Sequence, residues 1–239
     1  MAFFLPNSIK SYFMPLNLER VALVGRTYNE YKRMFNITKE YLEGKKTLDV
    51  AAGVSNFCAI GNVMGLDITA VDPIYHLMAD EIEVQAENDL ELVMNQLPVN
   101  SSNYNWDFYG DIEGVRVSRV KAYQTFLKHY QAHPKKYVPG EIGKLPFKDK
   151  AFDTTLVSHL MFLYDHMFSA EDHIAMFREL IRVTKNEIMI FPTKNLSGEN
   201  CKWVDLIIQN HEFLDHTFRL EKSHFEFQKG NYLRLRVTV

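Results

Sequence analysis

Short apolar runs alternate along this chain with stretches whose apolar residues recur at helical spacing. Residues 47–51 and 67–72 have the length and composition of buried strands, and a helix is expected between them. A second helix is predicted to begin at Ser169, because Asp172 follows three residues later as an imperfect capping box. The apolar positions of that helix are Ile174, Phe177, Leu180 and Ile181. This alternation predicts an α/β fold.

The C-terminal part of the chain is rich in short strand-like runs. Residues 187–191 form a buried run that Pro192 is expected to end. Two further strands are predicted at about 219–227 and 232–239, and Gly230-Asn231 between them is a hairpin signal.

The turn after the first predicted strand is built from small residues. Ala51, Gly53 and Ser55 leave room for a ligand to lie against the backbone, and the following helix offers free N–H groups. Asp72 comes 19 residues after Gly53, at the end of the second strand, where a carboxylate can accept both hydroxyls of a ribose. The unit therefore predicts an adenosine-type ligand.

Two other nucleotide sites are disfavoured by what is missing. The dinucleotide fingerprint Gly-x-Gly-x-x-Gly would need glycine where Ala51 and Asn56 stand. No Gly-Lys-Ser or Gly-Lys-Thr is present either, so a phosphate-cradling loop is not indicated.

The same turn resembles motif I of the class I S-adenosylmethionine-dependent methyltransferases. The usual Asp/Glu-x-Gly-x-Gly-x-Gly is here Asp49-x-Ala51-x-Gly53-x-Ser55. Residues 140–147 and 151–162 look like later motifs of that family, in the expected order.

The resemblance covers about residues 40–239 and implies a Rossmann-like, seven-stranded, doubly wound sheet, mostly parallel with an antiparallel last strand. It also implies the cofactor S-adenosyl-L-methionine and in-line methyl transfer without a metal. The cofactor-binding residues that it implies are Asp49, Ala51, Gly53, Ser55, Asp72, Pro73, Glu141, Ile142 and Ser158.

Two side chains near the end of the fourth predicted strand are candidates for chemistry. His159 would lie at the sheet edge, where an imidazole could take a proton from the acceptor, or it could only shape the pocket. Tyr164 is a comparable catalytic candidate.

We expect a single domain over residues 1–239, with two additions to the core of residues 41–72 and 137–239. Residues 1–40 are predicted to form a helical lid and residues 73–136 an inserted helical cap. The candidate substrate or lid residues are Tyr28, Tyr31, Trp106 and Tyr109. Tyr28 and Tyr31 share a helix face that could instead pack on the sheet, and the aromatic residues of the insertion could instead form the core of the cap.

The composition limits the kinds of molecule that the protein is expected to bind. A net charge of −3 and a pI near 6.3 argue against tight nucleic-acid binding, so a small molecule or a peptide is the expected substrate. Two cysteines imply no disulfide framework, and no run approaches the roughly 18 apolar residues of a membrane span. A cytoplasmic protein is expected, and the oligomeric state is left open.

Two alternatives to a methyltransferase remain from the sequence. The altered glycines suit a non-catalytic protein that binds S-adenosylmethionine and regulates a partner, although Asp49, Asp72 and Glu141 favour a working site. The same cofactor also serves aminopropyl and aminocarboxypropyl transferases, which would keep the fold and change the reaction.

Overall fold

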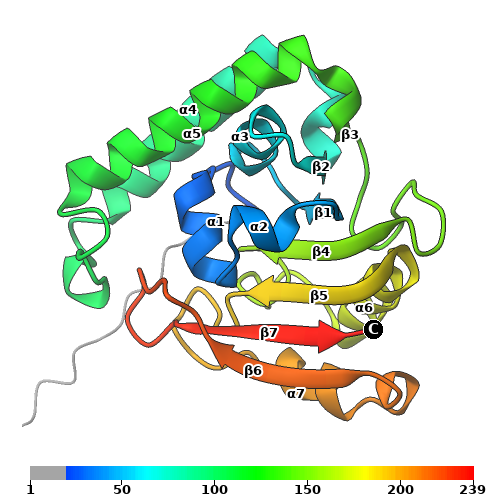
Figure 1. Ribbon diagram of the computed structural model, residues 1–239. Coiled ribbons are helices and arrows are strands. Elements are labelled where there is room, and N and C mark those ends of the chain that lie inside the picture. The colour runs from blue at the N-terminus through cyan, green and yellow to red at the C-terminus, as the bar shows by residue number, and fades with distance from the viewer. Residues whose placement is uncertain (1–19) are drawn as a thin grey trace, which may run out of the picture.

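A seven-stranded sheet forms the centre of the protein, and a computed structural model describes it for residues 20–239. The strand order is β3-β2-β1-β4-β5-β7-β6 (Figure 1). The strands are β1 Lys46–Val50, β2 Asp67–Val71, β3 Tyr137–Val138, β4 Phe152–Ser158, β5 Thr184–Phe191, β6 Thr217–Lys222 and β7 Leu233–Thr238. Strands β1 to β5 are parallel, and β7 runs antiparallel to both β5 and β6. The predicted fold class is therefore confirmed.

Helices cover both faces of this sheet. They are α1 Tyr28–Phe35, α2 Lys39–Leu42, α3 Phe57–Val63, α4 Ala79–Gln96, α5 Ile112–Ala132, α6 Ala170–Val183 and α7 Lys202–Gln209. In Figure 1, α1 and α2 lie in front of the sheet, and α6 and α7 lie behind it. The central strands are buried along nearly their whole length because both faces are covered, which explains their continuous apolar runs.

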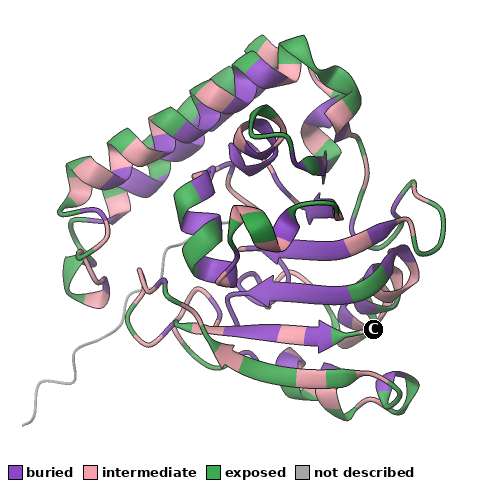
Figure 2. Cartoon of the chain, viewed as in Figure 1, coloured by how far each residue is buried: buried purple, intermediate pink, exposed green. Residues whose placement is uncertain are grey.

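Residues 73–136, predicted as an inserted cap, fold mainly as the long helices α4 and α5. The two helices lie side by side along one end of the molecule, and α5 also packs on α3 (Figure 1). Figure 2 shows their outer side exposed and their inner side buried. No helix within residues 20–239 is both long and apolar enough to cross a membrane.

Two sequence predictions about element ends are confirmed. Helix α6 begins after a capping box in which Ser169 Oγ accepts from the Asp172 N–H at 3.1 Å and the Asp172 carboxylate accepts from the Ser169 N–H at 2.8 Å. Strand β5 ends at Phe191, directly before Pro192. These signals are local, so the surrounding fold did not override them.

The predicted C-terminal hairpin forms, but it has no tight turn at Gly230-Asn231. The strands β6 and β7 do pair, but Lys222 already faces Leu233, so residues 223–232 form the connection. This connection leaves the sheet because it pairs with the segment before α5: the Asn105 N–H donates to the Phe227 carbonyl at 2.7 Å, and the Lys229 N–H donates to the Asn103 carbonyl at 2.9 Å. Contacts distant in sequence thus override the turn signal.

Candidate functional site

A cavity of about 560 Å³ opens where the parallel strands β1, β2 and β4 end. Its walls come mainly from segments near 21–26, 51–55, 72–74, 140–143 and 158–164. We call this the first cavity. Its size lies within the usual range for small-ligand sites, roughly 300–1,000 Å³, and the carboxyl ends of parallel strands are where such sites form.

The small-residue turn predicted to face a ligand lines the first cavity. Ala51 and Gly53 both adopt left-handed backbone conformations, with φ of 54° and 51°. This conformation is free of cost for glycine, but it costs an alanine about 1–2 kcal/mol. The turn therefore keeps its shape even where the family pattern's glycine is replaced by Ala51.

Asp72 follows β2 and is held by the turn that follows β1. Its Oδ2 accepts from the Gly53 N–H at 2.9 Å, and its Oδ1 accepts from the Ile74 N–H at 3.1 Å. Burial raises the pKa of this carboxyl, although the two backbone N–H groups oppose the change. A carboxylate has about four acceptor sites, so capacity remains for further hydrogen bonds from a ligand in the cavity.

The residues that cover the turn, residues 21–26, form an irregular segment that is neither helix nor strand. A Cβ on Gly25 would stand 2.3 Å from the Val54 carbonyl oxygen, so the segment packs directly on the turn. The Arg26 N–H donates to Ser55 Oγ at 3.1 Å, and the Asn56 N–H donates to the Arg26 carbonyl at 3.1 Å. Ser55 and Asn56, at or beside positions where nucleotide motifs have glycine, thus fasten this N-terminal segment.

In the described part of the predicted helical lid, α1 belongs to the core rather than to a lid, and residues 1–19 of that prediction lie outside the described residues. Tyr28 and Tyr31 stack on Phe57 of α3, with ring centroids 5.5 and 4.4 Å away, and neither lines the first cavity. Their shared face is the apolar face of α1, and it is covered by neighbouring elements. Both tyrosines therefore pack in the core, which is the alternative to a lid that the shared helix face allowed.

Asp49 lies in the core next to the cavity and is absent from its lining. Tyr31 Oη donates to Asp49 Oδ1 at 3.0 Å, while Oδ2 is buried without a hydrogen-bond partner. Burial raises the pKa of Asp49 well above its ordinary value, and the nearby Asp72 adds to the increase. Asp49 thus supports the turn from within the sheet, and direct contact with a ligand in the cavity is not indicated.

The two aromatic candidates of the insertion also lie away from the first cavity. Trp106 packs on Phe227, and its Nε1 donates to the Ser101 carbonyl at 3.1 Å. Tyr109 Oη donates to Glu30 Oε1 at 2.5 Å. Both side chains join the insertion to other parts of the chain.

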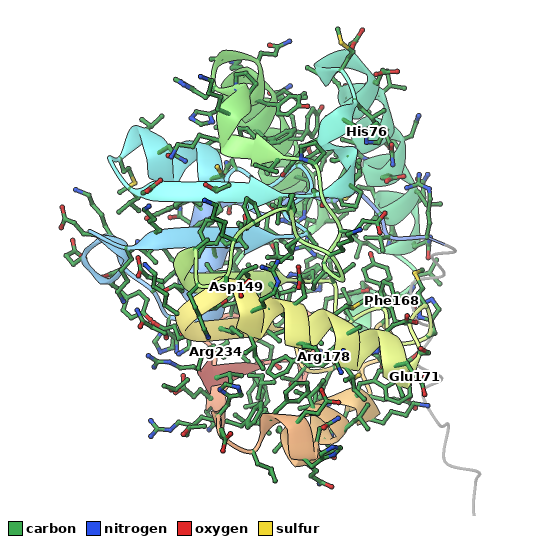
Figure 3. The ribbon with its side chains drawn as sticks, turned by 90° about the vertical axis from the view of Figure 1, so that its right-hand side faces the viewer. His76, Asp149, Phe168, Glu171, Arg178 and Arg234 are labelled. Carbon is green, nitrogen blue, oxygen red and sulfur yellow. The ribbon has the colours of Figure 1, made fainter. Side chains whose placement is uncertain are left out.

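The remaining predicted cofactor residues meet at the first cavity. Ala51, Gly53, Ser55 and Asp72 line it from the ends of β1 and β2. Pro73, Glu141, Ile142 and Ser158 complete the predicted set along the same wall of strand ends. Figure 3, which looks onto α6, shows Phe168 beside the beginning of that helix, and Phe168 lines the cavity too.

The two candidates for chemistry also line the first cavity. His159 has a left-handed backbone, with φ of 54°, and its Nδ1 lies 2.9 Å from Ser158 Oγ. Burial lowers the pKa of His159 well below its ordinary value, and the positive charges of Arg26 and Arg119 lower it further. Tyr164 Oη accepts from the Ala22 N–H at 3.3 Å. His159 is therefore neutral at pH 7, and Tyr164 helps to fasten the N-terminal segment.

Arg26 is a site residue to which the sequence assigned no separate role. Its side chain is only 15% exposed and lines the cavity. Nη1 donates to the Val24 carbonyl at 2.9 Å, Nε is buried without a hydrogen-bond partner, and the nearest carboxylate oxygen, Glu30 Oε1, lies 3.8 Å from Nε. Burial lowers the pKa of Arg26. No local sequence pattern reveals that an arginine in an irregular segment faces inward.

Behind Arg26 lies a buried ionic cluster that joins α1 to α5. Arg119 Nη1 donates to Glu30 Oε1 at 2.6 Å, and Arg119 Nη2 donates to Tyr109 Oη at 2.6 Å. The Arg26 and Arg119 guanidinium groups hold the pKa of Glu30 below its usual range against the effect of burial. Two arginines and one carboxylate leave the cluster with an excess positive charge.

Similar proteins were found among curated sequences and solved structures, whereas no family model matches the chain. The magnesium protoporphyrin IX methyltransferase of Synechocystis PCC 6803 is 11% identical, with a TM-score of 0.45, covering 83% of this chain and 72% of that one. A SAM-dependent methyltransferase from Aquifex aeolicus is 14% identical, with a TM-score of 0.40, covering 87% and 91%.

A much higher identity links the chain to a protein of Methanocaldococcus jannaschii. Uncharacterized protein MJ0045 of that organism is 38% identical over 216 residues, which cover 90% of this chain and 95% of MJ0045. Identity at this level over nearly the full length of both chains shows common membership, and the chain belongs to the family of MJ0045.

Proposed function

We propose that the protein is an S-adenosylmethionine-dependent methyltransferase that acts on a small molecule or a peptide. The observation that carries the proposal is Asp72, a buried carboxylate at the end of β2, tied to the Gly53 turn and facing a ligand-sized cavity. This arrangement suits a ribose whose two hydroxyls both donate to one side chain.

The residues that line the cavity also fit the adenine of the cofactor. Ile142, which is buried, and Glu141, which is exposed, both line the cavity and offer an apolar and a polar edge for an adenine. When bound, the cofactor supplies a methyl group that its sulfonium has already activated.

The chain's own residues then need to orient the acceptor and receive at most one proton. Ser158 Oγ holds the His159 ring through Nδ1 at 2.9 Å, and in the tautomer in which Nδ1–H donates to Ser158, Nε2 is the nitrogen that can accept a proton. The low pKa of His159 keeps the ring neutral and ready to accept, at the expense of basicity. Most of the rate would then come from proximity and alignment.

Calorimetric titration tests the proposal. The protein should bind S-adenosylmethionine and S-adenosylhomocysteine with micromolar affinity and should not bind NAD or ATP. The Asp72→Ala variant should lose at least about 100-fold in affinity, since two hydrogen bonds to a charged group contribute about 1.5–3 kcal/mol each.

Two controls separate binding from folding. Thermal unfolding of ligand-free Asp72→Ala shows whether the turn still forms without its carboxylate, and Asp72→Asn keeps the shape with only part of the acceptor capacity. A folded Asp72→Ala protein with unchanged cofactor affinity would contradict the placement of the ribose.

A further inference from the structure

A second, smaller cavity of about 80 Å³ lies next to the first. The two cavities share four lining residues, Val24, Arg26, His159 and Leu163. These four form the boundary between the cavities, which we call the doorway. The doorway lies at the end of β4, across β1 from Asp72. With a ribose at Asp72, the reacting end of the cofactor would lie on the doorway side.

Most of the side chains that line the second cavity are apolar or aromatic, and many of them come from segments outside the sheet. Helix α4 contributes Val93, Leu97 directly follows that helix, and α5 contributes Val115. The β6–β7 connection contributes Phe225 and Phe227. A flat apolar body would therefore bury its surface there.

Charge sets the second requirement on a ligand. Arg26 and Arg119 line this cavity, and within the described part of the chain no aspartate or glutamate does. Glu30 is hydrogen-bonded to Arg119 and Tyr109, so it does not complete the hydrogen bonding of Arg26. An ammonium group would meet positive potential here, whereas an anionic oxygen would supply the missing acceptor for Arg26.

An unpaired acceptor lines the same cavity. Asn231 is 5% exposed, and its Oδ1 is buried without a hydrogen-bond partner, while Nδ2 donates to Gln228 Oε1 at 3.1 Å. The side chain is held in place by Gln228, so its oxygen stays available to a donor on a ligand.

We propose that the second cavity is the acceptor site and that it takes a small apolar oxyacid, a carboxylic acid or a phenol, whose acidic oxygen lies at the doorway and receives the methyl group. The proposal rests on the proposed function. A new bond forms between this oxygen and the methyl carbon, while the carbon–sulfur bond breaks and its electron pair stays on sulfur. A carboxylate has no proton to lose, and the proton of a phenol passes to His159 Nε2.

The first test uses four probes that share a phenyl ring and differ in its polar group: benzoate, phenol, benzamide and benzylamine. Each is titrated into the protein saturated with S-adenosylhomocysteine, and binding is followed by calorimetry and by the shift in melting temperature. Benzoate and phenol should bind about tenfold tighter than benzamide and benzylamine, because only the first two can bring an acidic oxygen to Arg26.

Matched variants locate the binding. Val115→Phe should fill the cavity and weaken benzoate binding at least about tenfold, while S-adenosylhomocysteine still binds. Val117→Phe is the control, since Val117 is 58% exposed on the same helix. If Val115→Phe fails to fold, Asn231→Asp serves instead, because the added carboxylate should reject benzoate and favour benzylamine.

The outcomes separate the two proposals. S-adenosylhomocysteine binding with no benzoate or phenol binding, or with equal binding of benzylamine, would overturn the acceptor site and leave the proposed function standing. Benzoate binding that Val115→Phe abolishes, in a protein that never binds S-adenosylhomocysteine, would support the oxyacid site while contradicting the methyltransferase.

Discussion

The two cavities meet at one doorway but are built in different ways. One wall of the first cavity is formed by residues that directly follow β1, β2 and β4, so the parts of this wall are fixed by three neighbouring strands. The second cavity is assembled from α4, α5 and the β6–β7 connection, which are far apart in the sequence. The comparison teaches that the wall of strand ends in the first cavity is encoded locally, whereas the second cavity exists only when distant segments pack together.

The two cavities also differ in the charged residues that line them. Asp72, Glu141 and Asp172 line the first cavity, whereas the charged residues lining the second are both arginines. Arg26 belongs to both. The polar character of each cavity is thus set by a different part of the chain. At the doorway, the negative potential of the acidic residues meets the positive potential of the arginines.

The largest expected effect comes from breaking the cluster that joins the segments of the second cavity. Glu30→Ala would leave Arg119 and Arg26 buried without their carboxylate, which should lower the free energy of unfolding by about 3–5 kcal/mol. Urea denaturation measures this loss. Glu113→Ala is the matched control, because its ion pair with Arg116 is exposed and should contribute no more than about 1 kcal/mol. Equal losses in the two variants would refute the structural role of the cluster.

A smaller effect concerns pH and the support beneath the first cavity. Because the pKa of Asp49 is raised in the folded protein, the native state keeps a proton that the unfolded chain loses above pH of about 4. Stability should therefore fall as pH rises from about 4 toward the raised pKa, by at most about 1.4 kcal/mol per pH unit. Asp49→Asn should lack this part of the slope.

Chemical denaturation at several pH values compares the two proteins directly. Glu30, whose pKa is lowered, gives a slope of the opposite sign in both of them, so the difference between wild type and Asp49→Asn isolates Asp49. Parallel curves would show that Asp49 is ionised in the folded protein.

The smallest expected effect tests the strain in the turn of the first cavity. Ala51→Gly should raise the free energy of unfolding by about 0.5–1 kcal/mol, because relief of the left-handed φ exceeds the added freedom of the unfolded chain. Ala52→Gly is the control: Ala52 is buried without a positive φ, so the change should destabilise by a similar amount. Thermal unfolding of both variants decides the sign.

Sequence patterns predicted most of what depends on neighbouring residues. The strand runs, the small-residue turn and the position of Asp72 follow from local periodicity and spacing, and all of them meet at the first cavity. Tyr28 and Tyr31 mark the limit of local patterns. Their shared helix face predicts that both side chains are buried, but it does not identify the element that covers them. Only the packing of Phe57 against both rings decides it.

The second cavity was beyond prediction for a related reason. Phe227 reaches it because the β6–β7 connection pairs with residues before α5, a contact that overrides the Gly230-Asn231 turn signal. Arg26 reaches it because Ser55 and Asn56 hold an irregular segment through hydrogen bonds to its backbone. Neither contact leaves a periodic trace in the sequence.

The shared doorway has a thermodynamic consequence for whatever the two cavities bind. Arg26 cannot give the same donors to an anion on each side at once, so occupation of one cavity must change the affinity of the other. By linkage the factor is the same in both directions. The order in which ligands enter and leave is then governed by one guanidinium group, and a single coupling constant, measured from either side, describes it.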